Sequence, residues 1–207
     1  MNHPLVKSSP VSPPQELAHL FADPPVARNE RREDYESLLA AIAAGVKPAD
    51  AIEWMHALDI ADLSWEIRRE KSLKLHVIRT AETNVVERLL TPPSKPSADG
   101  SPTYFGAFLT DPQARDEARQ WASGDPEVRR KVDKILADRG EGAPYILHRA
   151  LQNSHSEIDA IDKRIATYEQ RRMAILRAAD LYSENLARRL EAASSEIIDG
   201  EFTEAAE

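Results

Sequence analysis

The chain contains no cysteine among its 207 residues. This absence excludes a disulfide framework, a thiolate nucleophile and a zinc site with cysteine ligands. Glycine is scarce too, with seven residues, so the sharp turns that cradle phosphates or expose a catalytic serine have few places to form. No phosphate-binding loop or nucleophile elbow occurs. We therefore expect a non-enzymatic protein that needs no cofactor.

Long apolar runs are missing as well. No stretch approaches the ~20 apolar residues of a membrane-spanning helix, and the first residues lack the basic-then-apolar pattern of a secretion signal. Aromatic residues make up 6% of the chain against 30% charged residues, which is typical of a helical protein with a thin core. The net charge of −8 disfavours a dedicated nucleic-acid binder, because phosphate contacts need a basic surface. The sequence thus predicts a cytoplasmic protein without a membrane partner.

Proline and glycine are unevenly distributed and divide the chain. Six prolines fall within residues 1–28, and five prolines with two glycines fall within residues 91–112. Such segments cannot hold a helix or bury a core. The predicted organisation is a disordered tail at 1–28, an N-terminal helical pair at 29–90, a linker at 91–111, a C-terminal helical hairpin at 112–195 and an acidic tail at 196–207, which we expect to fray.

Helix signals fill the regions between these breaks, and no strand is predicted. In the N-terminal region, apolar spacing predicts a helix over 30–44 that Gly45 ends. Pro48 then opens a second helix that reaches about Leu90. Its apolar rows cover 52–67, so we expect the polar stretch after Arg68 to fray or bend.

The C-terminal region carries two shorter helices and one long one. The shorter helices are predicted over 112–122 and, from the Asp125-Pro126 cap signal, up to Gly140. The stretch 145–199 then contains no glycine and no proline, so it reads as one long helix. The fold class is therefore all-α, with a C-terminal helical hairpin whose second arm is very long and coiled-coil-like.

An apolar seam at heptad spacing runs along this long helix. A fifty-residue helix spans roughly 75 Å, whereas a compact chain of this length is roughly 43 Å across. Either the molecule is elongated or another chain covers part of the seam. We therefore predict a homo-oligomer, or a complex with another helical protein, through an interaction seam of Leu151, Ile158, Ile161, Ile165, Tyr168, Arg172, Ile175, Tyr182 and Leu186.

A basic cluster in the same helix supports an alternative function. The cluster falls within fifteen residues that include one opposing acid, Glu169, and it comprises Lys163, Arg164, Arg171, Arg172 and Arg177. These side chains could contact nucleic-acid phosphates while Tyr168 stacks on a base, as in an accessory factor. We favour the other interpretation, in which they flank the seam and their stems cover apolar neighbours.

The third hypothesis is a metal-binding helical enzyme. Glu53 and His56 form one Glu-x-x-His pair, and di-iron bundles use two such pairs with two further glutamates. Because the chain has one copy, we expect no metal and assign both residues to a helix surface. The six histidines lack metal-ligand spacing to one another.

Four segments carry a resemblance to a known group of proteins. They are residues 47–74, 124–140, 159–178 and 196–202. In this order they resemble a group of helical proteins of soil alphaproteobacteria for which no activity is established. The resemblance covers most of residues 30–204. It implies a bacterial, cytoplasmic setting and supplies no site residues.

Overall fold

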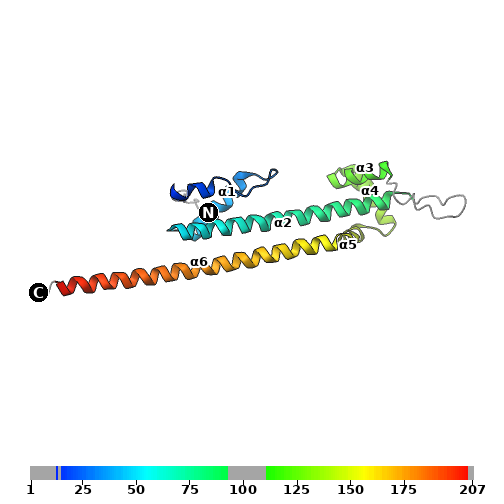
Figure 1. The fold of residues 1–207 in the computed structure, drawn as a ribbon. Coiled ribbons are helices and arrows are strands. Elements are labelled where there is room, and N and C mark those ends of the chain that lie inside the picture. Colours follow the sequence, from blue (N-terminus) through cyan, green and yellow to red (C-terminus); the bar gives the residue numbers. More distant parts are fainter. Residues whose placement is uncertain (1–12, 14, 93–110, 205–207) are drawn as a thin grey trace, which may run out of the picture. The chain divides into compact units, whose positions relative to one another are not determined.

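The structure is a computed structural model that describes residue 13, residues 15–92 and residues 111–204. Every regular element in these ranges is helical, which confirms the predicted all-α class. The elements are η1 (Gln15–Phe21), α1 (Arg32–Val46), α2 (Ala51–Leu90), α3 (Pro112–Ser123), α4 (Pro126–Asp138), α5 (Ala143–Asn153) and α6 (His155–Glu204) (Figure 1).

The chain forms two compact units, and both long helices contribute to each. Unit 1 comprises Met1–Arg69 and Ile165–Glu207, and unit 2 comprises Glu70–Arg164. The boundaries fall inside α2 and α6, whereas the sequence-based division fell in the segment 91–111, most of which lies outside the described residues. By sequence, unit 1 has 12 basic and 20 acidic residues, while unit 2 has 15 of each. The net negative charge therefore belongs to unit 1.

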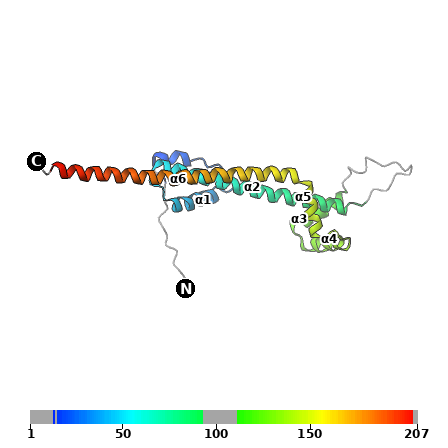
Figure 2. The same cartoon turned by 90° about the horizontal axis from the view of Figure 1, so that it is seen from below.

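The core of unit 1 forms where α1 lies beside the first half of α2 (Figure 2). Trp54, Ala57, Ala61 and Trp65 recur every three or four residues, so they share one face of α2, and all are buried. Tyr35 of α1 is 2% exposed, and its ring meets that of Trp65 edge-on at 5.7 Å. These large side chains explain how a chain with few aromatic residues still builds a core here.

The junction between α1 and α2 differs from the sequence prediction. Gly45 does not end α1, because the helix continues to Val46 and Lys47 takes the left-handed conformation, with φ 53°. Pro48 accounts for this end, since a proline drives the residue before it out of the helical region. Pro48 does not open α2 either. The helix begins at Ala51, where the Asp50 side chain accepts hydrogen bonds from the backbone N–H groups of residues 52 and 53 at 2.9 Å.

Unit 2 has its own core at the other half of α2. Val86 of α2, Ala118 of α3, Leu136 of α4 and Ile146 of α5 are almost fully buried together. The prediction that α2 frays or bends after Arg68 was wrong. The helix continues to Leu90 because its polar-looking second half still carries an apolar stripe, formed by Val77, Ala81, Val85 and Val86.

The predicted single long helix is in fact two helices. Ser154, with φ −112° and ψ 15°, separates α5 from α6. The two helices pack differently within unit 2: α5 buries Ile146 and Ala150 in the core, whereas α6 buries Ile161. Neither glycine nor proline marks the break. At the other end, α6 continues to Glu204, through most of the segment expected to fray.

Part of the predicted disordered tail has defined structure. Residues 1–12 and 14 lie outside the described part of the chain, but residues 15–21 form η1. The segment between η1 and α1 is held by arginines: Arg69 donates a hydrogen bond to the Pro25 carbonyl at 2.7 Å, and Arg32 donates one to the Ala22 carbonyl at 3.2 Å.

Candidate functional site

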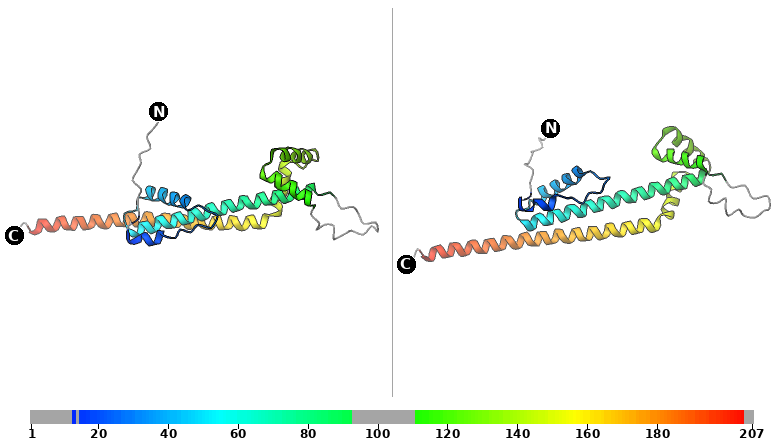
Figure 3. Two further views of the ribbon diagram at one scale, coloured as in Figure 1. Left: turned by 90° about the horizontal axis from the view of Figure 1, so that it is seen from above. Right: turned by 45° about the horizontal axis from the view of Figure 1, so that its top comes forward.

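The inner face of α6 in unit 1 packs against α2 of the same chain. Ile165 is 9% exposed, and the remaining seam residues of this part are half-buried, namely Tyr168, Arg172, Ile175, Tyr182 and Leu186. The Arg172 guanidinium donates to the Ser64 hydroxyl at 3.4 Å, and the Tyr182 hydroxyl donates to the Asp50 carboxylate at 2.9 Å. Later residues of α6 thus meet earlier residues of α2, so the two helices are antiparallel here (Figure 3).

The same seam is also occupied within unit 2. Ile161 is 1% exposed and Ile158 is half-buried. Beside them, Arg164 forms a two-pronged ion pair with Glu70 at 2.7 and 2.9 Å, and Lys74 pairs with Asp162 at 2.7 Å. Leu151, the first residue of the predicted seam, lies on α5 and is 39% exposed. From Ile158 to Tyr182 the seam is therefore mainly a contact within the chain, and a partner that binds α6 there would need another face.

That other face is an exposed stripe on the opposite side of α6, which we name the outer face. In unit 1 it begins with Ala166, Gln170, Met173, Ala174, Arg177 and Leu181, which recur at helical spacing. Two of its apolar side chains are largely exposed, Met173 at 47% and Leu181 at 59%. Sequence analysis missed this stripe because alanine gives a weaker hydrophobic signal than the leucine, isoleucine and tyrosine of the seam.

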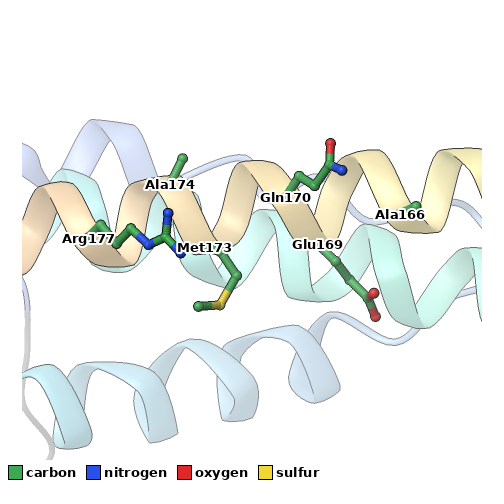
Figure 4. Close-up of a pocket in the computed structure, with 6 residues that line it drawn as sticks. All are labelled: Ala166, Glu169, Gln170, Met173, Ala174 and Arg177. Carbon is green, nitrogen blue, oxygen red and sulfur yellow. The ribbon is translucent and has the colours of Figure 1, made fainter.

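A shallow groove lies along the outer face. It has a volume of about 520 Å³ and is lined by Ala166, Glu169, Gln170, Met173, Ala174 and Arg177 (Figure 4). The short alanine side chains leave space along the helix, while Met173 and Arg177 project from it. A methionine at such a place adapts its shape to an apolar ligand. The groove therefore combines apolar side chains with one acid, Glu169, and one base, Arg177.

Within unit 1, α6 continues beyond the start of α2 (Figures 1 and 3). Tyr182 contacts Asp50, which caps the first turn of α2, and the helix then runs to Glu204. These further 22 residues correspond to roughly 33 Å of helix at 1.5 Å per residue. From Glu191 to Glu204 the sequence has five acids and no base. The last part of α6 is thus acidic, and it lies beyond the start of α2, the helix that covers the earlier part of α6 in this unit.

The predicted basic cluster is divided by its contacts. Lys163 pairs with Asp159 at 2.8 Å, Arg164 with Glu70, and Arg172 with Ser64. Arg171 and Arg177 are exposed, and Arg177 lines the groove. Among the described residues, three of the five cations thus have a partner within the chain, which leaves a smaller basic surface than the sequence indicated.

The two candidate metal ligands serve local structure. The Glu53 carboxylate accepts the Ala49 backbone N–H at 2.7 Å, which supports the start of α2. The His56 ring packs edge-on against the Tyr182 ring, with centroids 6.4 Å apart. In the parts of the chain that the structure describes, no group of three or more potential metal-ligating side chains could hold a metal ion.

A second groove, in unit 2, contains basic residues that sequence analysis missed. It has a volume of about 640 Å³ and is lined by residues of α2 and α3, among them Thr80, Asn84, Arg88, Arg115 and Arg119. Glu87, its acid, pairs with Arg115 at 3.2 Å. Sequence analysis could not find this set because 26 residues separate Arg88 from Arg115 in the chain.

Comparisons with known proteins give no family for the chain. No family model, no curated protein and no solved structure matches it. Among the described residues, no helix has the length and apolar character needed to cross a membrane.

Proposed function

We propose that the protein is a non-enzymatic, cytoplasmic assembly protein that joins another helical surface through α6, in a coiled-coil-like contact. One observation carries this proposal: α6 remains helical for 22 residues beyond its contact with Asp50. A helix that is surrounded by water gains little stability from hydrogen bonding alone, and most helices in proteins are stabilised by burying one face. The exposed Met173 and Leu181 supply apolar surface for such burial on the same helix.

The test is the mass of the protein in solution. Light scattering coupled to gel filtration should give a multiple of 23.1 kDa at micromolar concentration, and the mass should fall on dilution. If the mass stays at 23.1 kDa at every concentration up to about 100 μM, where even a weak specific interface should be partly occupied, self-assembly is contradicted. The purified protein would then have to be combined with a defined helical partner.

A second candidate function is contact with nucleic acid. The groove in unit 2 favours it. Its lining includes three arginines from two helices, Arg88, Arg115 and Arg119. Thr80 and Asn84, whose side chains can form hydrogen bonds, line the same groove. Arginine, threonine and asparagine all bind phosphate oxygens. On α6, the exposed Arg171 and Arg177 form a separate candidate surface, in the cluster that the sequence predicted.

Fluorescence anisotropy with short DNA and RNA separates these surfaces. If the groove binds phosphates, the double variant Arg88→Gln, Arg119→Gln should weaken binding and lower the salt slope by about two units. The matched variant Arg171→Gln, Arg177→Gln on α6 should then have little effect. If the unmodified protein shows no binding at about 50 mM salt, where phosphate contacts are strong, the second function is rejected.

A further inference from the structure

The charges of α6 are arranged with opposite signs at its two ends. Between Ile165 and Arg189 the sequence has five arginines and three acids, and between residues 190 and 204 it has five acids and no base. If two copies of this part of α6 lay parallel and in register, the acidic ends would lie side by side. In an antiparallel pair, the acidic end of each copy would lie along the arginine-rich part of the other. Like charges on neighbouring helix faces are destabilising and opposite charges stabilising.

The outer face of α6 is also symmetric in its spacing. From residue 174 onward it continues with intervals of three or four residues, and the intervals read the same forwards and backwards about Arg188. The positions are 174, 177, 181, 184, 188, 192, 195, 199 and 202. Such a stripe can meet its own copy in antiparallel orientation, residue for residue.

We propose that two copies of the chain pair through the outer faces of α6, antiparallel, with the two-fold axis near Arg188. This inference rests on the proposed assembly function and names the partner as a second copy. The pairing places Arg177 opposite the partner subunit's Asp199, and Leu181 opposite the partner subunit's Ser195. At the centre, each Arg188 already has Glu184 of its own helix at 3.5 Å, which limits the repulsion between the two arginines.

The pairing reaches one end of the groove. Ala174 and Arg177 lie there, opposite positions 202 and 199 of the partner subunit. Two acids, Asp199 and Glu201, come shortly before Phe202 in the sequence, and Arg177 forms one end of the groove. The paired region, residues 174–202, is roughly 43 Å of helix.

Site-specific cross-linking tests the orientation directly, because the chain has no native cysteine. Two single variants are needed, Leu181→Cys and Ser195→Cys, and neither changes a charge. When the two purified variants are mixed and oxidised, a disulfide should form between position 181 of one copy and position 195 of the other. Each variant alone should give little covalent dimer. Ala160→Cys, at an exposed position of α6 outside the paired region, is the matched control.

The outcomes separate this inference from the proposed function. A protein that light scattering shows to be monomeric contradicts both. A dimer in which each variant cross-links with its own copy, while the mixture gives no 181–195 product, is parallel and contradicts the inference alone. A dimer that yields none of these products uses another face of the chain, and this also contradicts the inference alone.

A charge swap tests the contact at the groove. In a symmetric dimer, Arg177 and Asp199 would form two equivalent pairs. Arg177→Glu and Asp199→Arg should each weaken dimerisation by about tenfold, as the loss of two exposed ion pairs and their replacement by like charges would do. The variant with both substitutions should recover most of the affinity. If the double variant is as weak as the two single losses combined, the two residues do not face each other.

Discussion

Glu30 holds three parts of unit 1 together. Its carboxylate accepts hydrogen bonds from the Trp65 indole at 2.9 Å, from the Arg69 guanidinium at 2.8 Å and from the Ala27 backbone at 2.8 Å. The segment before α1 is thereby fixed to the middle of α2. These donors, Arg69 above all, lower the pKa of Glu30 from 4.5 to about 2.

This pKa shift predicts an acid sensitivity. A carboxyl whose pKa is lowered by folding stabilises the native state above its unfolded pKa, and the contribution is lost as pH falls toward the folded value. Glu30→Gln should therefore lower the free energy of unfolding by about 1–2 kcal/mol at pH 7, after allowance for solvent screening. The difference from the unmodified protein should narrow between pH 4.5 and pH 2.

Urea unfolding at pH 7, 4 and 3 measures that difference. Glu33→Gln is the matched control, because Glu33 is 70% exposed and lies 3.6 Å from Arg31 in a surface pair that contributes little. A constant gap between Glu30→Gln and the unmodified protein across this pH range would show that the ionisation of Glu30 does not stabilise the fold.

Arg172 occupies a seam position where a leucine would fit the apolar pattern. It is half-buried, and its hydrogen bond to the Ser64 hydroxyl is long at 3.4 Å. Arg172→Leu should raise the free energy of unfolding by about 1 kcal/mol, because apolar burial replaces a partly desolvated charge. Since Arg172 contacts α2 of its own chain, the mass in solution should not change.

Thermal melting of Arg172→Leu checks this expectation. Arg171→Leu, one residue away and exposed, should give no such stabilisation. A lower melting temperature for Arg172→Leu would mean that the guanidinium contributes more to unit 1 than one long hydrogen bond indicates.

At the scale of elements, local signals account for most of the correct predictions. Asp125 with Pro126 begins α4 as the cap signal in the sequence indicated, because a cap uses groups within three residues of one another. The helix predicted from residue 112 begins there in the same way, at Asp111 and Pro112. Features decided by distant residues could not be predicted. The break at Ser154 carries no glycine or proline, and its position depends on what α5 and α6 each pack against.

The candidate site shows the same limit. Heptad spacing identified which face of α6 is apolar, but it could not reveal that Ser64 and Asp50, more than a hundred residues earlier, lie against that face. The groove on the outer face depends on alanines, whose hydrophobic signal is weak. The basic groove of unit 2 joins two helices across the segment 91–111.

The cap of α4 allows a test at this scale. The Asp125 side chain accepts the backbone N–H groups of Glu127 and Val128 at 3.0 Å. Asp125→Ala should lower the free energy of unfolding by about 1 kcal/mol. Asparagine caps a helix about as well as aspartate, so Asp125→Asn should have nearly the same free energy of unfolding as the unmodified protein. Urea unfolding followed by circular dichroism measures both. Equal losses for the two variants would point to the charge, and not the cap, as the cause.

For the whole molecule, the acidic end of α6 should matter for assembly and little for the stability of the monomer. A chain that ends at Leu190 lacks the last five acids of α6 and keeps every buried residue of both described cores. It should therefore be monomeric by light scattering at concentrations where the full chain is not. Its melting temperature should stay within a few degrees of the full chain's, since the lost residues carry none of that burial. A truncated protein that remains dimeric would place the interface elsewhere.

The division of the chain into units also bears on how it folds during synthesis. Unit 2 is one uninterrupted stretch, Glu70–Arg164, so all its residues have left the ribosome before α6 is finished. Unit 1 needs residues from both sides of unit 2, and its contacts between α2 and α6 must wait until α6 has been made. Contacts between such distant residues form slowly, and domains otherwise fold as they emerge. Unit 2 should thus form first, while Ser64 and Asp50 of α2 gain their contacts with α6 only after Arg172 and Tyr182 have been synthesised.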